Sequence, residues 1–210
     1  MENKPSVVMM GLGYIGLPTA ALIASRGLKV TGGDIRQGVV DTINKGQIHI
    51  VEPDLEGLVH KVVKDKNLYA STKPVSSDVY LVAVPTPFKG DHEPDLSYVM
   101  SAIKSIIPTL KKGALVILES TSPVGTTKKM EQFIYKERPE LKGHIFLAYC
   151  PERVLPGNIL NELKHNDRAI GGVDEISTKK AINFYKHFVV GTLHPTNAKT
   201  AEMVKLVENA

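Results

Sequence analysis

The sequence of 210 residues has one cysteine and no tryptophan, and aromatic residues make up only 6% of it. With Cys150 alone, an internal disulfide framework is excluded, and such cysteine usage is typical of a reducing compartment. Basic residues occur singly or in pairs, and the formal net charge is a mild +4. Tracts of Lys and Arg interleaved with aromatics, which mark nucleic-acid-binding surfaces, are lacking. We therefore expect a cytoplasmic protein with no nucleic-acid partner.

Long uncharged segments are also rare, and the one that spans Val7 to Ala24 is long enough to cross a bilayer. Three glycines and Pro18 lie inside it, and these residues weaken a helix that would run through the whole stretch. We therefore predict a strand, a turn and a helix here, with no membrane partner. The seven histidines show no metal-ligand spacing, so no metal site is predicted.

The turn in this segment has the spacing of a dinucleotide-binding βαβ unit. Gly11 permits a tight turn, Gly13 lets the backbone approach a pyrophosphate, and Gly16 lets the helix pack closely on the strand. The N-terminus of the following helix offers unpaired N–H groups to phosphates. A second apolar run ends at Asp34, where a carboxylate accepts hydrogen bonds from ribose hydroxyls. We predict NAD as the cofactor.

Two alternatives accompany this interpretation. Glycines at this spacing also occur in ordinary strand-to-helix turns, so the preceding strand, the following helix and the acid carry the prediction. Arg36 allows an NADP-linked hydroxyacid dehydrogenase of the same fold, because a guanidinium pairs with a 2′-phosphate. Asp34 would repel that phosphate, which favours NAD.

Short apolar strands alternate with amphipathic helices along almost the whole chain, as in a doubly wound α/β fold with a mostly parallel, Rossmann-type sheet. Ligands bind such sheets at the carboxyl ends of the strands. The strands are expected at 6–10, 29–34, 68–70, 78–84, 114–119, 145–149, 168–172 and 189–192. The helices are expected at 15–25, 37–45, 55–64, 96–109, 126–137, 176–187 and from 196 onward.

The pattern at the end of the chain predicts a helix that starts near Thr196, with an apolar stripe of Met203, Leu206, Val207 and Ala210. No glycine or proline ends this helix before Ala210, so we expect a fragment of a longer protein. The predicted organisation is a dinucleotide-binding domain over 1–195 and the start of a long central helix over 196–210. We expect the stripe to be exposed or to pair with another copy.

Polar side chains follow the expected strands at the edge where ligands bind. Thr86 lies between two prolines that stiffen the loop after the fourth strand, although a rigid turn explains them equally well. After the fifth strand, we expect Thr126 or Ser122 to cap the next helix, while another hydroxyl of the segment 119–127 faces the ligand.

After the sixth strand, Glu152 lies beside Arg153, where it can act as a general acid or base or bind substrate. The alternative is a surface ion pair, which is common and weak. Cys150 has no histidine near it in sequence, and we expect it to pack at the strand end. On the last helix, Lys205 and Asn209 share a face.

Together and in this order, the segments Gly11–Pro18, Val84–Asp95, Glu119–Gly125, Tyr149–Gly157 and Glu202–Asn209 resemble the UDP-glucose/GDP-mannose dehydrogenase family. Members that act on glucose carry Pro-Glu-Phe-Leu where this chain has Pro151-Glu152-Arg153-Val154. The difference favours an N-acetylated hexosamine. The resemblance implies oxidation of the C6 hydroxyl of a UDP-sugar with two NAD+, as in surface polysaccharide biosynthesis. UDP-N-acetyl-D-mannosamine is the expected substrate, with UDP-N-acetylglucosamine or UDP-glucose as alternatives.

The resemblance also implies roles for single residues. Thr121 resembles the residue that positions a catalytic water, and Glu152 resembles the acid/base. Lys205 and Asn209 resemble the pair that stabilises an oxyanion at C6. Arg153 and Val154, together with Lys205 and Asn209, resemble the substrate contacts. The cofactor site would comprise Gly11, Gly13, Tyr14, Ile15, Gly16, Asp34, Thr86 and Thr127.

One feature of the family has no counterpart in the chain. The nucleophilic cysteine of the family lies in a Gly-rich segment beyond position 210 and is followed by a UDP-binding domain. Cys150 does not match that cysteine, so we do not expect the 210 residues to complete the four-electron oxidation. A dinucleotide-binding module without turnover is therefore the second hypothesis. For the longer protein, a UDP-sugar substrate and a homodimer are expected.

Overall fold

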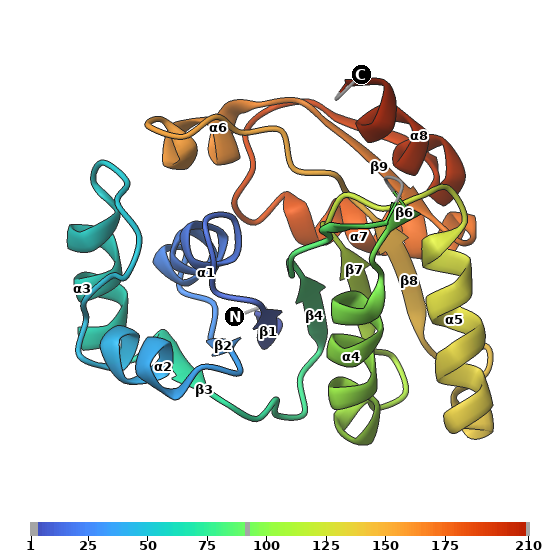
Figure 1. Ribbon diagram of the computed structural model, residues 1–210, viewed down its shortest axis with the longest axis horizontal. Helices are drawn as coiled ribbons and strands as arrows, with labels where there is room; N and C mark the ends of the chain where they lie inside the picture. Colours follow the sequence, from blue (N-terminus) through green and yellow to red (C-terminus); the bar gives the residue numbers. More distant parts are fainter. Residues whose placement is uncertain (1–3, 91–92, 209–210) are drawn as a thin grey trace.

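The computed structural model describes residues 4–90 and 93–208. Its centre is an eight-stranded sheet in the order β10-β9-β8-β7-β4-β1-β2-β3 (Figure 1). The strands are β1 (Val7–Met10), β2 (Val30–Gly33), β3 (Leu68–Ser71), β4 (Val79–Val82), β7 (Leu115–Leu118), β8 (Phe146–Tyr149), β9 (Arg168–Gly172) and β10 (Leu193–Asn197). All neighbours are parallel except β8 and β9. A separate antiparallel pair joins β5 (Phe88–Lys89) to β6 (Glu93–Pro94).

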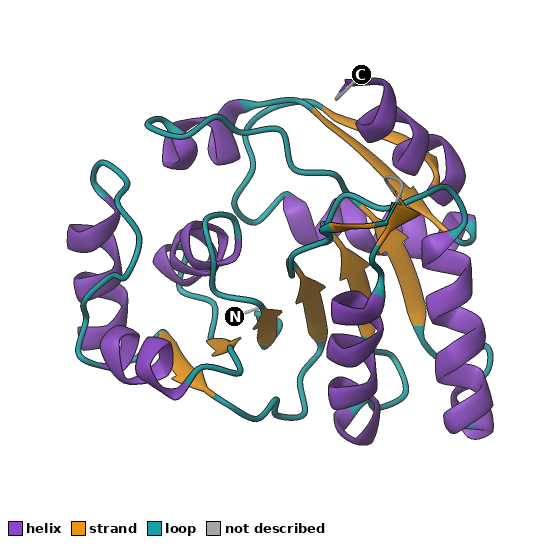
Figure 2. Cartoon of the chain, viewed as in Figure 1, coloured by secondary structure: helices purple, strands orange, loops and turns teal. Residues whose placement is uncertain are grey.

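Helices cover both faces of the sheet (Figure 2). The α-helices are α1 (Gly16–Ser25), α2 (Gln37–Asn44), α3 (Leu55–Lys64), α4 (Ser97–Ile106), α5 (Thr126–Glu137), α6 (Ile159–His165), α7 (Glu175–Tyr185) and α8 (Ala198–Glu208). Two short 3-10 turns lie at Ile107–Thr109 and Pro139–Leu141. One buried cluster holds side chains of α1, α2, α3, α6 and α7, and the other holds those of α4, α5 and α8.

The central strands are buried on both faces, and their side chains alternate between the two clusters. Val7 and Met9 of β1 belong to the first cluster, and Val8 and Met10 belong to the second. Successive strand residues point to opposite faces, so a strand covered on both sides reads as a continuous apolar run. The predicted fold class, a doubly wound and mostly parallel sheet, is confirmed.

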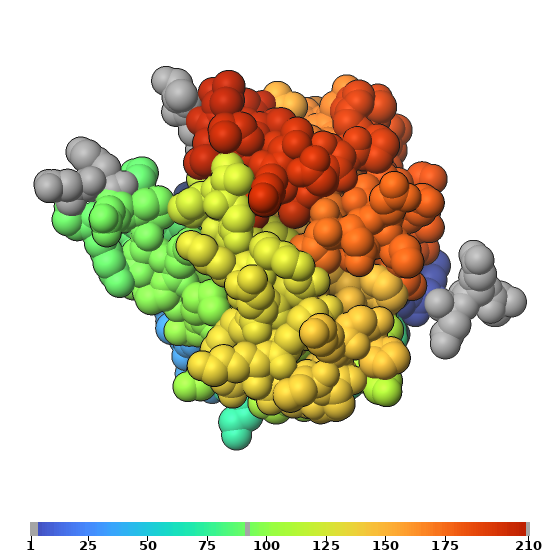
Figure 3. All heavy atoms as spheres, turned by 90° about the vertical axis from the view of Figure 1, so that its right-hand side faces the viewer, coloured from blue at the N-terminus to red at the C-terminus, as the bar shows by residue number. Residues whose placement is uncertain are grey.

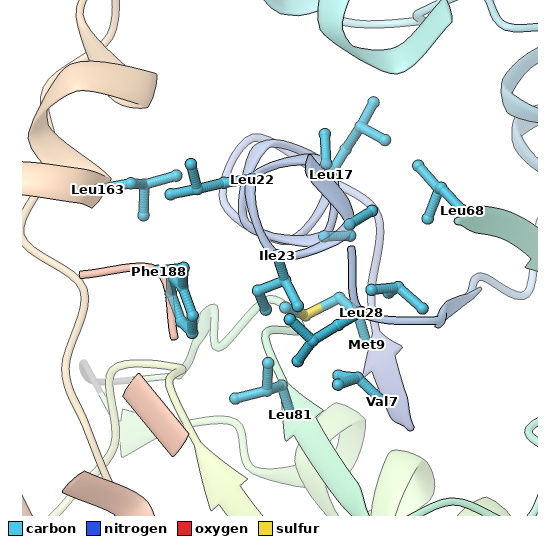
Figure 4. Close-up of a cluster of buried hydrophobic side chains, with 14 of the residues drawn as sticks. Val7, Met9, Leu17, Leu22, Ile23, Leu28, Leu68, Leu81, Leu163 and Phe188 are labelled. Atoms are coloured by element: carbon cyan, nitrogen blue, oxygen red, sulfur yellow. The ribbon is translucent and has the colours of Figure 1, made fainter. Parts of the chain in front are cut away.

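Helix α1 lies inside the molecule, and all its residues from Gly16 to Ala24 are buried. Figure 4 shows Leu17, Leu22 and Ile23 of this helix packed among side chains of β1, β3, β4, α6 and the segment after α7. Each large aliphatic side chain buried in this way contributes about 1.5–3 kcal/mol to folding. The uncharged stretch Val7–Ala24 is therefore a core strand, a turn and a core helix. In the described part of the chain, no helix is long and apolar enough to cross a membrane.

The reversed strand β9 pairs with only a short part of β8. Ala148 lies opposite Gly172, and Tyr149 lies opposite Gly171. The rest of β9 therefore extends past the carboxyl end of β8, and β10 follows it in parallel. As a result, Arg168 at the start of β9 lies beside the residues that come after β8.

Two sequence expectations near the end of the chain are wrong. The expected strand at 189–192 is an irregular loop, because Val190 N and Gly191 N donate to Lys164 O and the strand starts at Leu193. The expected helix start at Thr196 is two residues early, since Thr196 and Asn197 still pair with β9. Helix α6 was not expected at all.

Helix α8 packs on the domain through Ala201 and Glu202, which are fully buried. Figure 3 shows its atoms, in red, against those at the start of α5. Met203 and Val207 are exposed on the opposite side, beside Val124, and line a hollow of about 760 Å³. The predicted exposure of the stripe is therefore confirmed for these two residues, whereas Leu206 is half-buried and Ala210 lies outside the described residues. The predicted domain boundary after residue 195 falls inside β10.

Candidate functional site

The glycine turn after β1 has a backbone that only glycine fits at two of its three positions. Gly11 has φ +91°, and a Cβ on it would lie 2.4 Å from Ala83 O. A Cβ on Gly16 would lie 1.8 Å from Gly11 O, so the helix starts in direct contact with the turn. At Gly13, by contrast, no atom of the described chain lies within 4 Å of such a Cβ. The middle of the turn is therefore open to a ligand.

No described side chain caps the start of α1, whose N-cap residue is Ile15. The first N–H groups of a helix have no partner within the helix, and the helix dipole places partial positive charge there. This end of α1 has the properties of an anion site.

At the end of β2, the carboxylate of Asp34 is held by donors from two sides. Its Oδ2 accepts from Leu12 N at 3.3 Å, and its Oδ1 accepts from Arg36 N at 3.0 Å. The Arg36 guanidinium forms two further bonds to it, at 3.0 and 3.1 Å. Burial alone would raise the pKa of Asp34, but the hydrogen bonds from Arg36 and Leu12 outweigh it and lower the pKa. The group is therefore a carboxylate at neutral pH.

A pocket of about 370 Å³ opens at the carboxyl ends of the parallel strands. It brings together residues from the ends of β1, β2, β4, β7 and β8, and one from α8. The lining residues are Gly11, Leu12, Gly13, Tyr14, Ile15, Asp34, Arg36, Ala83, Val84, Pro85, Thr86, Glu119, Ser120, Thr121, Glu152, Val154 and Lys205.

Among the described residues, three of the predicted site residues do not line this pocket. Gly16 is buried beneath the turn. Thr127 is fully buried, and both its N and Oγ1 donate to Glu202 Oε1. Arg153 is exposed and forms an ion pair with Glu208 of α8. Asn209 lies outside the described residues.

Two loops of the pocket are joined by one hydroxyl group. Ser120 Oγ accepts from Val84 N at 2.9 Å and donates to Val84 O at 2.7 Å. These bonds join the ends of β4 and β7, which carry Thr86 and Thr121 into the same pocket.

Glu152 is not part of a surface ion pair with its neighbour in sequence. It is only 6% exposed, and its Oε2 lies 2.8 Å from Nη1 of Arg168, which is itself buried. Its other oxygen accepts from Arg153 N at 2.8 Å. Both oxygens of this buried side chain therefore have hydrogen-bond partners.

These features coincide with a match to a known family. Residues 5–189 match the sequence pattern of a family described as "UDP-glucose/GDP-mannose dehydrogenase family, NAD binding domain". The chain belongs to this family. Members are NAD-dependent nucleotide-sugar dehydrogenases.

Several relatives in the family are similar over nearly the whole chain. A UDP-N-acetyl-D-mannosamine dehydrogenase of Escherichia coli K12 is 55% identical over 98% of the chain and 51% of its own length. One of Campylobacter jejuni is 56% identical over 100% of the chain and 54% of its length. A solved UDP-D-ManNAc dehydrogenase of Pyrococcus horikoshii superposes with a TM-score of 0.92 at 43% identity, covering 97% of this chain and 50% of that one. The chain thus spans about half the length of these relatives.

The residues of this family member fit NAD. The open position at Gly13 and the uncapped start of α1 suit a diphosphate, and the Asp34 carboxylate suits the hydroxyls of a ribose. A 2′-phosphate would be repelled by the negative charge of Asp34. The Arg36 guanidinium, which could otherwise bind such a phosphate, is already paired with Asp34. NAD, which the family uses, therefore fits better than NADP.

The single cysteine of the chain is not placed as a nucleophile. Cys150 is fully buried at the end of β8, and burial raises the pKa of its thiol to about 12. It stays a thiol at neutral pH, and only thiolates attack readily. The expected packing role is confirmed. Within the described residues, no cluster of three or more His, Cys, Asp or Glu side chains suits a metal ion.

The sequence analysis missed residues that hold the site together from a distance. Glu52, between α2 and α3, accepts from Gly157 N at 2.9 Å and from Ile159 N at 2.7 Å, which fixes the loop after Glu152. Arg168 pairs with Glu152, and Glu202 binds the start of α5. No local pattern signals these contacts.

The expected cap of α5 is also corrected. Thr126 Oγ1 donates to Pro123 O and Ser122 Oγ donates to Ser120 O, so neither caps the helix. Glu202 of α8 accepts from Gly125 N at 2.5 Å and Thr127 N at 2.8 Å. A carboxylate is favourable at a helix N-terminus, and this one arrives from another element.

Proposed function

We propose that this chain forms the NAD-binding part of an enzyme that oxidises the C6 hydroxyl of UDP-N-acetyl-D-mannosamine to a carboxylate. The observation that carries the proposal is the single pocket that joins the glycine turn and Asp34 to Thr86, Thr121, Glu152 and Lys205. The relatives that are 55–56% identical carry the name of this activity, which supports the choice of sugar. UDP-N-acetylglucosamine and UDP-glucose remain the alternatives.

The predicted site residues have proposed roles. Asp34 binds the adenosine ribose, and the backbone from Gly11 to Ile15 binds the diphosphate. When bound at these residues, NAD+ would supply the acceptor for the hydride of C6. Lys205 places a cation where negative charge develops on the C6 oxygen, a device worth a few kcal/mol in such sites. Asn209 is proposed to assist Lys205, and it lies outside the described residues.

Glu152 is the proposed acid/base, because it is a buried carboxylate at the substrate side of the pocket. Thr121 is proposed to orient a water molecule, and Arg153 and Val154 are proposed to contact the sugar. Thr127 supports the cofactor site indirectly, through its bonds to Glu202. Gly16 supports it by close packing under the turn.

We further propose that the 210 residues bind NAD without sustained turnover. The chain spans about half of its relatives, and its one cysteine is a buried thiol. The second oxidation requires a nucleophile that captures the aldehyde. The longer protein would supply that nucleophile, and would form a homodimer.

Two measurements on the same sample test this proposal. Calorimetric titration should give saturable binding of NAD+, tighter than that of NADP+. Addition of UDP-N-acetyl-D-mannosamine should then give no continuing rise in NADH absorbance. Sustained NADH production would contradict the proposal that the 210 residues bind NAD without turnover. Absence of NAD+ binding would contradict the proposed cofactor site. With the longer protein, faster NADH production from UDP-glucose than from UDP-N-acetyl-D-mannosamine would contradict the substrate.

A further inference from the structure

A buried carboxyl group that has no assigned role lies at the floor of the pocket. Glu119 follows β7, is 3% exposed and lines the pocket. Its Oε1 accepts from the Tyr185 hydroxyl at 2.5 Å. Its Oε2 is buried and has no hydrogen-bond partner among the described residues. Buried polar atoms are nearly always paired, so an unpaired one beside a pocket indicates a contact with a bound molecule.

The sheet order tells which end of the cofactor site Glu119 occupies. Asp34 follows β2 on one side of β1, whereas Glu119 follows β7 on the other side. A dinucleotide with its ribose at Asp34 and its diphosphate over Gly13 therefore extends toward β4 and β7. Glu119 lies at the nicotinamide end of this path, as do Thr86 and Thr121.

Charged and titratable groups surround Glu119 from several elements. They are Tyr185 of α7, Arg168 of β9, Glu152, Cys150 and Tyr149 around the end of β8, and Lys205 of α8 across the pocket. Burial, and after it the negative charge of Glu152, raises the pKa of Glu119 to about 7, although Arg168 and Tyr185 oppose this. Near neutral pH, the group is divided between its acid and carboxylate forms.

We propose that the protonation state of Glu119 follows the charge of the nicotinamide ring. Glu119 keeps its proton beside the neutral reduced ring and releases it to solvent beside the cationic oxidised ring. The inference rests on the proposed function, because it requires NAD in this pocket. An opposite charge within about 4–6 Å favours the charged form of a carboxyl group. No bond to the cofactor is involved.

The same exchange balances the proton of the reaction. When a C6 hydroxyl is oxidised, a hydride leaves carbon for the ring, and the hydroxyl proton must also leave. The ring becomes neutral in that step, so Glu119 regains a proton as the substrate loses one. Glu152, held by Arg168, is the base nearer the substrate, and Glu119 is the second proton acceptor.

Calorimetry with two buffers of different ionisation enthalpy measures this exchange without turnover. At pH 7, binding of NAD+ should release about half a proton, because a group with a pKa of about 7 is half protonated there. Binding of NADH should release almost none. The affinity for NAD+ should be about tenfold higher at pH 8 than at pH 6.

Three variants identify the group. Glu119→Gln should bind NAD+ with no proton release and with a flat pH dependence. Glu131→Gln, which removes another buried carboxyl group outside the pocket, should behave as the wild type. Tyr185→Phe removes the hydrogen bond that lowers the pKa of Glu119, so proton release should shift to higher pH.

Several outcomes would overturn the inference. One is equal proton release with NAD+ and NADH, and another is unchanged release in Glu119→Gln. If Glu119→Gln does not fold, two measurements still test the inference. They are the difference in proton release between NAD+ and NADH in the wild type, and the shift of proton release to higher pH in Tyr185→Phe. Binding of NAD+ with no proton release would remove only this role of Glu119. Absence of binding by either form would remove the cofactor site as well.

Discussion

The two ends of the pocket are built in different ways. The adenosine end, named after the ligand group proposed to bind there, consists of a glycine turn, a helix N-terminus and Asp34, all within one strand–helix–strand unit. The reaction end, named after the step proposed to take place there, combines Glu119, Glu152, Arg168 and Tyr185, which follow or belong to four different elements. One end depends on backbone shape and the other depends on side chains that meet only in the folded chain.

The carboxyl groups at the two ends have opposite titration behaviour for the same reason. Donors from Leu12 and Arg36 surround Asp34, and they lower its pKa. Glu119 has one donor and is buried, so its pKa rises. The comparison indicates that two factors set the pKa of a carboxyl group in this pocket: the number of hydrogen-bond donors lowers it and burial raises it. A lowered pKa suits a permanent hydrogen-bond acceptor, and a raised pKa suits a group that takes up and releases protons.

The largest effect is expected at the reaction end, for Arg168→Met. This change leaves Glu152 as a buried charge without its ion-pair partner, which typically costs about 3–5 kcal/mol. Urea unfolding measures it. Adding Glu152→Gln should recover much of the loss, because the second change removes the unpaired charge. A loss below about 1 kcal/mol in the single variant would contradict the importance of the pair.

The next effect is a pH dependence of stability from Glu119. A carboxyl group whose pKa is raised in the folded state binds more protons there, so stability falls as pH rises from 4.5 through about 7. Relative to Glu119→Gln, the wild type should lose about 2–3 kcal/mol across this window. Thermal unfolding at several pH values checks it. Parallel pH profiles of the two proteins would show that Glu119 does not titrate.

A smaller loss is expected for Glu202→Gln. The change weakens charge-assisted bonds to Gly125 N and Thr127 at the start of α5, for an expected loss of about 2 kcal/mol. Glu208→Gln on the same helix is the control, because Glu208 is exposed and its ion pair with Arg153 is worth about 0–1 kcal/mol. Equal stability of the two variants in urea would refute the capping role.

The smallest effect is expected at the adenosine end, for Asp34→Ala. The ribose loses a charged acceptor, so the dissociation constant of NAD+ should rise about tenfold, or about 1.4 kcal/mol. NADP+ should weaken less, because Arg36 becomes free to pair with a phosphate. Asp41→Ala, an exposed change on α2, should leave both constants as they are. An unchanged affinity for NAD+ in Asp34→Ala would contradict the assigned ribose contact.

The sequence allowed the adenosine end to be predicted because its signals are local. The glycine spacing, the apolar runs and Asp34 follow one another along the chain, and the structure places them as expected, apart from one or two residues at element ends. The strands β1, β2, β4, β7 and β8 were predicted in the same way. Thr86, Thr121, Glu152 and Lys205, whose roles the resemblance to the family implied, line the pocket.

The reaction end was predicted only in part because its contacts join distant elements. For Glu152, the sequence offered a surface ion pair with Arg153 only as the alternative to an acid/base role, and it gave no sign of Arg168, with which the folded chain pairs Glu152. The cap of α5 was sought among Ser122 and Thr126, yet it is Glu202 of α8. Neither contact follows from periodicity, since each depends on how an element packs in three dimensions.

The part of β9 that extends past the carboxyl end of β8 limits where residues can be inserted into this chain. Only Ala148 and Tyr149 pair with β9, and Arg168 meets Glu152 by continuation of that register. Inserting one residue between Arg168 and Gly171 would turn Arg168 to the other face of the sheet and away from its partner. Insertions of several residues in the exposed stretch 155–158 would leave the pairing intact. Strand β9 is therefore the part of the chain whose length is held most strictly, since a single added residue separates Arg168 from Glu152.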